Sequence, residues 1–547
     1  MEIVWERIHM TIRMRLSSPL DAPESAASEV SFAVEQPSRV FPVNSTDEGD
    51  GAFAVHINIT TFADRKAIPN GVWRVRAYFG DAPGPAASFD GGALTYLDEA
   101  SRVFHFDSNR SALTVSFGVE EPYDDAPRLD FLIMAYQLAL APGSPDGTSA
   151  FAAAKRALFG QDAKRRYARW IYNIVARIVG PKKGRILFAS DQQPSMEGNL
   201  RRVHERMLER GLDKRFDMRY SFRLPGTTGW GATSRILYLM ATSEIILLDD
   251  YFGLLNSVTV SRRSRIIQLW HAGVGFKAVG FSRFGRSDSP KLSQPHRQYT
   301  YAICGSEHLR HVYAEAFGIE ESAVIPTGLP RVDWFLDEER TAGFVTEFYD
   351  EYPHLRSKRI ILFAPTFRGS SYHAATYDYG LIDLAALYEA CGQDTAVLFR
   401  MHPFVKDAID IPQEFQDRFF DFTKYEDGLG LLHVTDLLIT DYSSVIYEYS
   451  LLDRPMLFFA PDRVNYAATR GFHHDYVDTA PGRVCATFNE VIDAIATCEF
   501  EQEKVARFRA ENFDRIDTGS ADRVIDWLID DQSSAAGSAE ARTDGER

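Results

Sequence analysis

Apolar and polar side chains alternate along several short stretches near the start of the chain. The alternation is clearest in Phe53–Thr60, Val72–Tyr78 and Leu113–Phe117. A period of two places every second side chain on one face of a strand, so these stretches predict β-strands with one buried face. Turn-forming residues such as Asn70–Gly71 separate them. Residues 1–145 are therefore expected to form a β-rich, sandwich-like accessory domain without chemistry of its own.

From Gly184 onward the pattern changes to short, mainly apolar runs separated by helix-like spans such as Asn199–Arg210. The runs are Arg185–Ser190, Ser243–Leu248, Arg265–Trp270 and Tyr301–Cys304, followed by Arg359–Ala364, Ala396–Arg400, Asp436–Thr440 and Pro455–Phe459. Buried strands that alternate with helices are typical of a parallel α/β sheet. We expect two Rossmann-like, doubly wound domains, at 184–345 and 346–532, which face a cleft where strand carboxyl ends gather. The tail at 533–547 is rich in Ser, Ala, Gly and charge and is expected to be disordered.

A basic, amphipathic segment lies between the two regions, at 146–183. From Lys155 to Arg185 the chain carries ten Lys or Arg residues and one acid, Asp162. Apolar residues such as Trp170 and Ile174 complement the charge, so the segment suits an anionic membrane surface. A linker helix that docks on its neighbours and leaves its charges in water is the alternative.

Composition and charge argue against several classes of function. The chain has 547 residues, too many for one core, and a formal net charge of −16, which disfavours a general nucleic-acid-binding role. Its four cysteines lack a CxxC spacing, which argues against a disulfide framework or a structural zinc site. No export signal and no apolar run long enough to cross a bilayer are visible, so we expect a cytoplasmic protein that sits peripherally on the membrane.

The strongest candidate for a ligand site is Thr440–Glu448, where a buried strand turns into a helix. The hydroxyls of Ser443 and Ser444 and the free amides of the first helical turn would point at a phosphate. The alternative is that these serines only cap the helix. Glu448 would either accept hydrogen bonds from ribose hydroxyls or be an exposed helix glutamate.

A second candidate is the strand end that carries Arg400 and His402. Pro403 stops the strand, and both side chains would face the cleft. A guanidinium pairs with phosphate oxygens in a fork, so Arg400 is a candidate pyrophosphate clamp, with His402 sharing the charge. A lone strand-end histidine is more often a surface residue, and the interpretation rests on the pair preceding the serine turn by one predicted strand.

A third candidate is the glycine-containing loop of Gln268–Lys277. Its glycines do not match the dinucleotide fingerprint. The loop would present His271 and Lys277 to the opposite domain, which suits His271 as a general base for an acceptor hydroxyl. A structural histidine is the alternative.

Two further strand ends carry polar residues. Thr366 and Arg368 follow another strand and offer further anion ligands, unless Arg368 is only an exposed turn residue. The acid pair Asp249–Asp250 lacks a spaced third ligand, so we interpret it as a loop and predict no metal site.

Six motifs in order resemble the CDP-glycerol glycerophosphotransferase family, which makes teichoic acids. They are QLWHAG (Gln268–Gly273), GLPRVD (Gly328–Asp333), APTFRG (Ala364–Gly369), RMHPFV (Arg400–Val405), TDYSSVIYEYSLLDRPMLFF (Thr440–Phe459) and RGF…PG (Arg470–Gly482). The resemblance covers roughly Gly184 to Asp530. It implies a GT-B fold and transfer of an alditol phosphate from CDP-glycerol or CDP-ribitol, the substrate, to a lipid-linked polyol-phosphate acceptor, with release of CMP and no further cofactor.

Carried over position by position, the resemblance makes His271 the base, Arg400 and His402 ligands of the donor phosphates, and Ser443 and Ser444 the phosphate turn. Glu448 falls where related GT-B enzymes hold the nucleotide ribose. Two alternatives stay open: a GT-B glycosyltransferase that uses a sugar nucleotide, and a non-catalytic polymer-binding protein. A homo-oligomer is compatible with the sequence.

Overall fold

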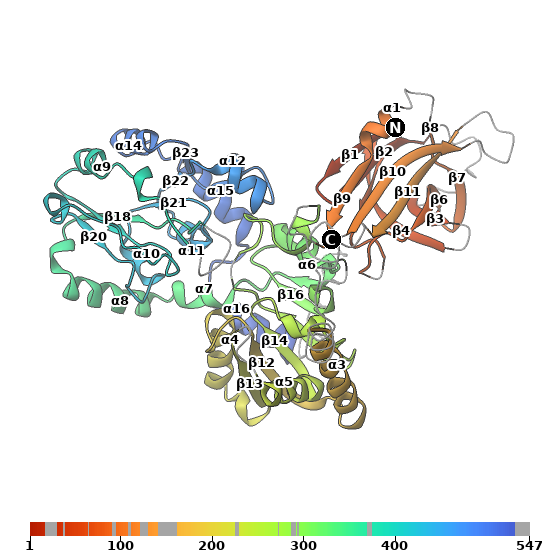
Figure 1. Ribbon diagram of the computed structural model, residues 1–547, viewed down its shortest axis with the longest axis horizontal. Coiled ribbons are helices and arrows are strands. Elements are labelled where there is room, and N and C mark those ends of the chain that lie inside the picture. Colours follow the sequence, from red (N-terminus) through yellow and green to blue (C-terminus); the bar gives the residue numbers. More distant parts are fainter. Residues whose placement is uncertain are drawn as a thin grey trace, which may run out of the picture. The chain divides into compact units, whose positions relative to one another are not determined.

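The computed structural model describes residues 1–16, 30–36, 39–63, 65–89, 95–107, 111–120, 129–139, 161–224, 229–271, 273–285, 292, 295–368 and 375–530. The chain divides into two compact units, each described by itself (Figure 1). The first comprises Met1–Ala163 with Val279–Arg297 and Ala314–Glu320, and the second comprises the rest. The tail predicted to be disordered, and residues 146–160 of the predicted linker, lie outside the described residues.

The first unit is built from antiparallel strands, as the alternating pattern predicted. Its strands are β1 (Glu2–Glu6), β2 (His9–Arg15), β3 (Val30–Gln36), β4 (Arg39–Gly49), β5 (Ala52–Asn58), β6 (Gly71–Phe79), β7 (Ala82–Ala86), β8 (Ser88–Phe89), β9 (Arg102–Phe106), β10 (Ser111–Glu120) and β11 (Leu129–Ala139), with the helix α1 (Thr95–Ala100). They pair in the order β1-β2-β5-β4-β3-β6-β11-β10-β9, while β7 pairs with β6 and β8 with β11.

Strand β4 changes its pairing partner along its length and so joins the two parts of this sheet. Its first half, up to Val43, pairs with β3, and its second half, from Asn44, pairs with β5. A strand that changes partners in this way lets one sheet fold over onto itself. The rings of Trp5 on β1 and Phe104 on β9 consequently lie 5.4 Å apart although these strands end the sheet order.

Short segments from the middle of the chain complete the first unit. The buried carboxylate of Glu315 accepts hydrogen bonds from Arg7 at 3.0 and 2.9 Å, and lies 2.7 Å from Nε2 of His9. Phe284 stacks on Phe106 with ring centroids 5.2 Å apart. Residues from the middle of the sequence therefore contribute to the core of the β-rich unit.

The second unit contains two separate sheets of six strands each, and all their strands are parallel. The first has the order β13-β12-β14-β15-β16-β17, with β12 (Lys182–Ser190), β13 (Asp217–Phe222), β14 (Ser243–Leu248), β15 (Arg265–Gln268), β16 (Tyr301–Ile303) and β17 (Val324–Ile325). The second has the order β20-β19-β18-β21-β22-β23, with β18 (Arg359–Phe363), β19 (Thr395–Phe399), β20 (Phe419–Asp421), β21 (Leu437–Thr440), β22 (Met456–Phe459) and β23 (Arg483–Cys485). The parallel sheets that the apolar runs predicted are confirmed.

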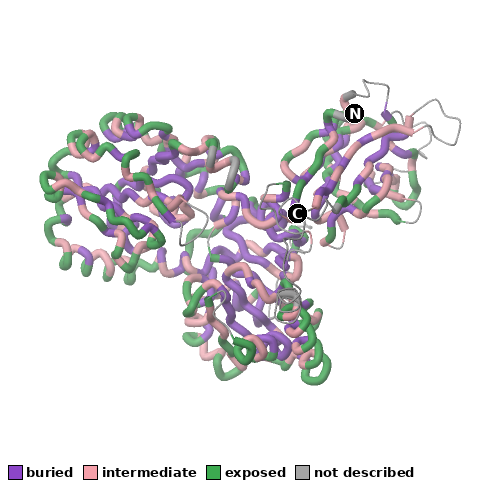
Figure 2. Tube along the Cα trace, in the orientation of Figure 1, coloured by how far each residue is buried: buried purple, intermediate pink, exposed green. Residues whose placement is uncertain are grey.

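Both faces of the second sheet are buried, because its strand residues alternate between two hydrophobic clusters. Ile360 and Leu362 contribute to one cluster, and their neighbours Ile361 and Phe363 to the other. Figure 2 shows that buried residues, in purple, run through the interior of this part of the second unit. A sheet covered on both faces needs apolar residues at every position, which is why these strands read as continuous apolar runs.

Helices connect these strands and cover the sheets. They are α3 (Gln161–Ile178), α4 (Gly198–Glu209), α5 (Trp230–Thr242), α6 (Arg310–Phe317), α7 (Pro330–Phe335), α8 (Glu338–Glu351), α9 (Leu384–Ala390), α10 (Gly430–Val434), α11 (Val445–Ser450), α12 (Arg463–Thr469), α13 (Tyr476–Thr479), α14 (Phe488–Thr497), α15 (Glu503–Asn512) and α16 (Ser520–Val524). None of the helices in the described part of the chain is long and apolar enough to cross a membrane.

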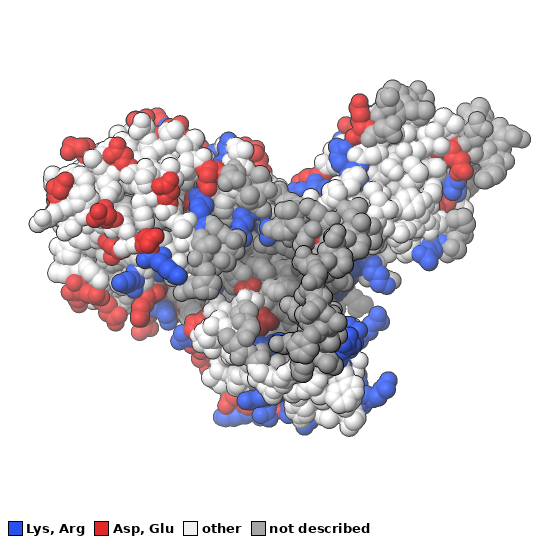
Figure 3. Space-filling view, in the orientation of Figure 1, with Lys and Arg blue, Asp and Glu red and all other residues white. Residues whose placement is uncertain are grey.

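Helix α3 confirms the helical, amphipathic character predicted for its segment. Ala168 and Tyr172 are buried, whereas Trp170 and Ile178 are 60% and 77% exposed. Lys and Arg side chains stand out where α3 lies (Figure 3). The helix therefore presents both large apolar groups and positive charge to solvent.

Candidate functional site

Three of the predicted motifs follow neighbouring strands of the second sheet. β19, β18 and β21 lie side by side in that order and run parallel. Their carboxyl ends meet at one edge of the sheet, where α/β proteins bind ligands. Thr366 and Arg368 follow β18, Arg400 and His402 follow β19, and Ser443 and Ser444 follow β21.

The buried carboxylate of Asp441 ties two of these strand ends together. Its Oδ1 accepts hydrogen bonds from the amide and the hydroxyl of Thr366 at 2.8 and 2.9 Å, and its Oδ2 lies 2.9 Å from Nη1 of Arg368. Arg368 also donates Nε and Nη2 to the two oxygens of Asp462, at 2.6 and 3.0 Å. Thr366 and Arg368 are thus engaged by carboxylates, and their role as anion ligands stays a prediction.

The pKa values of the two aspartates shift in opposite directions, although Arg368 lowers both. Burial raises the pKa of Asp441, although the charge of Arg368 opposes it. Burial also acts to raise the pKa of Asp462, but the hydrogen bonds and charge of Arg368 outweigh it and leave that pKa below its usual value. Arg368 lies over the ring of Tyr442, which stacks on Tyr466 with centroids 3.8 Å apart. This network fixes the backbone that leads into the serine turn.

Lys277 lies at the same strand ends although it belongs to the loop that follows β15 of the first sheet. The second unit has two lobes, one around each sheet. The backbone of Lys277 forms an antiparallel bridge with Phe472 of the lobe around the second sheet, and the amide of Ala278 donates to the carbonyl of Gly471 at 3.1 Å. The third sequence motif is therefore brought to the second sheet, as its glycine-containing loop predicted.

The ammonium group of Lys277 has an unusual electrostatic environment. Burial lowers its pKa to about 8, with Arg470 and Arg368 acting in the same direction and Asp441 against it. Lys277 is therefore charged at neutral pH and loses its charge in mildly alkaline solution.

His402 lies near Lys277 and is held in one tautomer. Its Nδ1 accepts a hydrogen bond from the amide of Phe404 at 3.2 Å, so the proton of the neutral ring is on Nε2. Burial lowers the pKa of His402, and the charges of Lys277 and Arg400 lower it further. His402 therefore offers an N–H donor and not a second positive charge at neutral pH.

Arg400 points from the same strand end toward the loop that follows β20. Its Nη2 donates to the carbonyl of Tyr425 at 3.2 Å, and a Cβ at Gly428 would lie 2.4 Å from that nitrogen. Burial lowers the pKa of Arg400, and Asp427 acts against it. Among the described residues, no hydrogen-bond partner reaches its Nε, which is buried.

The serine turn has the form that the sequence predicted. Ser443 Oγ accepts a hydrogen bond from the amide of Val445 at 3.3 Å, while Ser444 precedes α11 and makes no capping hydrogen bond with its side chain. Ser443 therefore acts as a local cap, and Ser444 keeps its hydroxyl for another partner.

Glu448 is 1% exposed, which rules out the exposed helix glutamate. Its Oε1 lies 2.7 Å from Nη2 of Arg331. Burial raises the pKa of Glu448, and Arg331 opposes the shift. The same guanidinium donates through Nη1 to the backbone carbonyl of His271, so one arginine joins the loop of the predicted base to α11.

The imidazole of His271 is half exposed and has a carboxylate partner. Its Nδ1 lies 3.2 Å from Oδ2 of Asp250. A carboxylate at Nδ1 holds the proton on that nitrogen and leaves the lone pair of Nε2 to accept another proton. The arrangement is suited to general-base chemistry.

Asp250 is the residue that our interpretation of Asp249–Asp250 as a loop missed. It follows β14, whose Leu248 is in register with Gln268 of the neighbouring strand β15. Residues that follow paired ends of parallel strands lie close together, so Asp250 meets His271. The signal was present in the sequence as an acid pair and a histidine at two consecutive strand ends.

The backbone before His271 is held in an unusual conformation. Trp270 has a φ of 52°, a left-handed value that is rare for a bulky residue. Nδ2 of Asn199 donates to the carbonyls of both Leu269 and Trp270 at 2.8 Å. The buried amide of Asn199 thus stabilises the turn that presents the imidazole.

The loop that carries His271 packs directly on α11. A Cβ at Gly273 would lie 2.4 Å from the ring of Tyr447, and the amide of Phe276 donates to the Tyr447 hydroxyl at 3.2 Å. Only glycine permits this approach. His271, Lys277 and the serine turn therefore belong to one packed assembly.

Within the described part of the chain, no three His, Cys, Asp or Glu side chains are grouped so that they could hold a metal ion. The assembly combines ammonium and guanidinium groups, carboxylates and imidazoles, which are groups that bind anions and transfer protons.

A solved structure is similar to this chain in fold. The structure of the wall teichoic acid polymerase TagF superposes with a TM-score of 0.55 at 22% identity, and covers 70% of this chain and 96% of that one. The fold of the second unit is accordingly GT-B-like, with a strand-rich unit added to it.

Two teichoic acid polymerases are similar in sequence. The ribitol-phosphate polymerase TarL of Staphylococcus aureus is 40% identical over 63% of this chain and 62% of its own length. The poly(ribitol-phosphate) polymerase of Bacillus spizizenii is 38% identical over 65% of this chain and 58% of its own length. The chain thus spans about 60% of the length of these relatives.

The family model for CDP-Glycerol:Poly(glycerophosphate) glycerophosphotransferase matches residues 171–530. The chain belongs to this family, as the six motifs predicted.

Proposed function

We propose that this protein transfers an alditol phosphate from a CDP-alditol to a hydroxyl group of a lipid-linked polyol-phosphate polymer and releases CMP. The observation that carries the proposal is that every residue predicted for the site lies inside the family match, at 171–530. The two parallel sheets would be the Rossmann-like lobes of a GT-B enzyme, with the acceptor on the first and the donor on the second.

In the proposed reaction an acceptor hydroxyl attacks the β-phosphorus of the donor. A new phosphate ester bond forms, and the bond from the β-phosphorus to the bridging oxygen breaks, so that CMP leaves with the electron pair. Negative charge is spread over the transferred and leaving oxygens, and catalysis of such a transfer depends on positioning and charge stabilisation.

His271 would take the proton of the attacking hydroxyl on Nε2. Asp250 supports this role because it keeps the proton of the resting imidazole on Nδ1 and stabilises the imidazolium that forms. Arg331 would fix the backbone of this loop through the His271 carbonyl.

The donor phosphates would lie among Lys277, His402 Nε2, Arg400 Nε and the Ser444 hydroxyl. Lys277 brings a positive charge from the first lobe, and the other three bring hydrogen-bond donors from the second. Glu448 would bind the ribose only by sharing its carboxylate with Arg331.

Ribitol phosphate is the first candidate for the transferred group. Both relatives described above are named for ribitol phosphate, and a poly(glycerol phosphate) polymerase of Bacillus subtilis is 36% identical over a shorter stretch, 36% of this chain. CDP-glycerol is the second candidate.

The proposed location is the surface of an anionic membrane, with α3 as the contact. Its exposed apolar residues and its neighbouring cations suit a helix that lies in the interface.

One assay tests the function. The purified protein is offered CDP-ribitol, CDP-glycerol and a panel of sugar nucleotides with a lipid-linked polyol-phosphate acceptor, and released CMP and UDP are measured. We expect CMP from a CDP-alditol alone. Release of UDP from a UDP-sugar would identify a glycosyltransferase, and consumption of no donor would identify a non-catalytic polymer-binding protein.

A further inference from the structure

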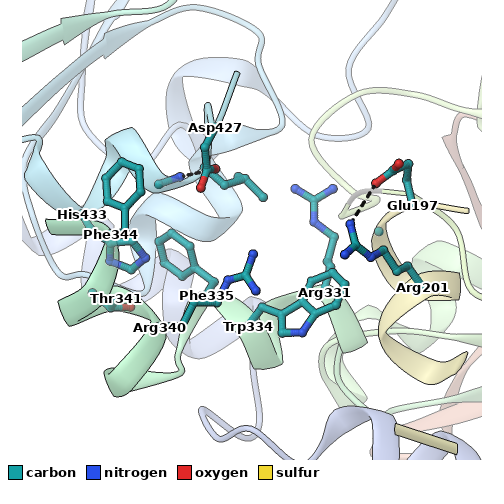
Figure 4. A pocket seen from close by; sticks show the side chains of 13 residues that line it. Glu197, Arg201, Arg331, Trp334, Phe335, Arg340, Thr341, Phe344, Asp427 and His433 are labelled. Atoms are coloured by element: carbon teal, nitrogen blue, oxygen red, sulfur yellow. Dashed lines mark hydrogen bonds and ion pairs between the residues drawn. The ribbon is translucent and has the colours of Figure 1, made fainter. Parts of the chain in front are cut away.

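A cavity of about 280 Å³ lies between elements of both α/β lobes. Its wall is formed by the start of α4, by α7 and α8, and by the start of α10 (Figure 4). Its volume is close to the lower end of ligand-sized cavities, roughly 300–1,000 Å³. It has room for a short piece of polymer or a nucleoside, and not for a complete CDP-alditol.

One side chain connects this cavity to the candidate site. Arg331 lines the cavity, and its guanidinium donates to the His271 carbonyl and pairs with Glu448 at 2.7 Å. A single side chain, that of Arg331, therefore reaches from the wall of the cavity to the backbone of the proposed base.

The wall of the cavity combines guanidinium groups with an aromatic surface. Arg201 and Arg340 lie over the ring of Trp334, with their guanidinium carbons 5.4 and 5.3 Å from its centroid. Figure 4 shows Arg331, Trp334 and Arg340 side by side along the helical wall. Guanidinium groups bind phosphate oxygens, and an aromatic face accepts the C–H groups of a polyol.

Carboxylates pair with two of the three guanidinium groups. Nε of Arg201 lies 2.8 Å from Glu205, and Arg331 pairs with Glu448, whereas Asp427 accepts a hydrogen bond from the amide of Gly430 at 2.8 Å. Burial and Arg454 lower the pKa of His433, which is stacked on Phe335 and so contributes an uncharged ring.

We infer that this cavity binds the end of the growing acceptor, a polyol phosphodiester, with a phosphate on Arg340 and the polyol against Trp334. The inference rests on the proposed function and names the acceptor subsite of that same site. Each unit of a phosphodiester polymer carries one negative charge, and among the described residues Arg340 is the guanidinium of this wall that is not paired with a carboxylate.

Direct binding tests the inference without catalysis. The full-length protein is titrated with a ribitol-phosphate trimer and with a glycerol-phosphate trimer, in the absence of donor, while tryptophan fluorescence is followed. We expect saturable quenching that is lost in Trp334→Phe and an affinity that falls roughly tenfold, about 1.4 kcal/mol, in Arg340→Gln.

The chain offers matched controls for both changes. Trp527 also has an arginine, Arg515, over its ring at 5.5 Å, and Arg356 also lies over an aromatic ring, Tyr349, at 5.5 Å. Neither pair lines the cavity. Trp527→Phe and Arg356→Gln should leave trimer binding unchanged, and an equal loss in these controls would overturn the inference.

Steady-state kinetics separates the acceptor from the donor. Arg340→Gln should raise the KM of the acceptor about tenfold and leave the KM of the CDP-alditol unchanged. A rise in the donor KM alone would assign the cavity to cytidine and overturn the inference, as would no change in either.

The two proposals fail in different ways. CMP release by the wild type without quenching by either trimer would refute the acceptor subsite and leave the function standing. Trimer binding at Trp334 without turnover of any donor would support the subsite and refute the function.

Discussion

In the proposed reaction the carboxylate of Asp250 acts through His271, and a double substitution tests this. Asp250→Asn removes the charge that stabilises the imidazolium, so we expect kcat to fall by roughly 10²–10³. The KM of the donor should stay the same, because Asp250 does not contact the donor phosphates in our proposal. Asp250→Glu, which retains the carboxylate, should recover part of the rate.

The control is the same change in a protein without the base. His271→Ala should lower kcat by roughly 10²–10⁴, the contribution of a positioned base, while donor binding, measured by calorimetry, survives. Adding Asp250→Asn to His271→Ala should cause no further loss, since the two residues work as a unit. A further loss of the same size would mean that Asp250 supports the fold and not the base.

If Lys277 binds the donor phosphates as proposed, the reaction has a pH dependence of defined sign. The charge of Lys277 is present below a pKa of about 8 and is lost above it. We expect kcat/KM for the donor to fall as the pH rises through about 8, because the free enzyme loses a phosphate ligand. Lys277→Arg should move this alkaline limb to higher pH. A limb that stays in place in Lys277→Arg would exclude Lys277 as its origin.

At the scale of single elements, α3 should determine membrane binding. We expect Trp170→Ser with Ile178→Ser to weaken binding to vesicles that contain phosphatidylglycerol by at least tenfold. The reason is that burial of one large apolar side chain contributes roughly 1.5–3 kcal/mol. Vesicle sedimentation measures this loss.

Val464 on α12 supplies the matched control, because it is 78% exposed and belongs to another helix. Val464→Ser should bind vesicles like the wild type. Full binding by the α3 variant would contradict the membrane role and favour a linker helix with solvated charges.

The elements that the apolar runs predicted are the central strands of both sheets, and those that they missed are the edges. The strands absent from the prediction, β13, β17, β20 and β23, are all first or last in their sheets. β13, for example, has no fully buried residue. An edge strand has fewer neighbours to bury it, so it is short or half polar and lacks the continuous apolar run that marks an interior strand.

Site residues that follow interior strands were predicted, and those defined by a distant partner were not. Arg400, His402 and the serine turn follow interior strands, and the prediction located them from local pattern alone. Asp250 and Arg331 were missed because their importance comes from a partner, His271, to which they are joined across 21 and 60 residues of sequence, and pairing of that kind is decided by the packing of the sheets.

At the scale of the whole second unit, helix α16 is tied to helix α7, which follows the first sheet. The carboxylate of Asp333 is 2% exposed and accepts hydrogen bonds from the amides of Ser520 and Ala521, both at 2.9 Å. Helix α16 is thereby capped by a residue far away in sequence, which anchors it.

Asp333→Ala leaves two buried amides without an acceptor. We expect the free energy of unfolding to fall by about 2–4 kcal/mol and the thermal midpoint by roughly 3–8 °C. Thermal unfolding followed by circular dichroism measures both. Asp337→Ala removes the exposed N-cap of α8 and should cost about 1 kcal/mol. Equal shifts in the two variants would show that the link to α16 contributes nothing beyond a surface cap.

The contact between Gly273 and Tyr447 has a consequence for how the enzyme would handle an empty cleft. The loop is covalently part of one lobe and is seated on a helix of the other, so parting the lobes would withdraw the proton acceptor from the phosphate pocket in the same motion. A donor that arrives while the lobes are apart would meet no active base. In that arrangement no imidazole would be placed to deprotonate water against the activated ester.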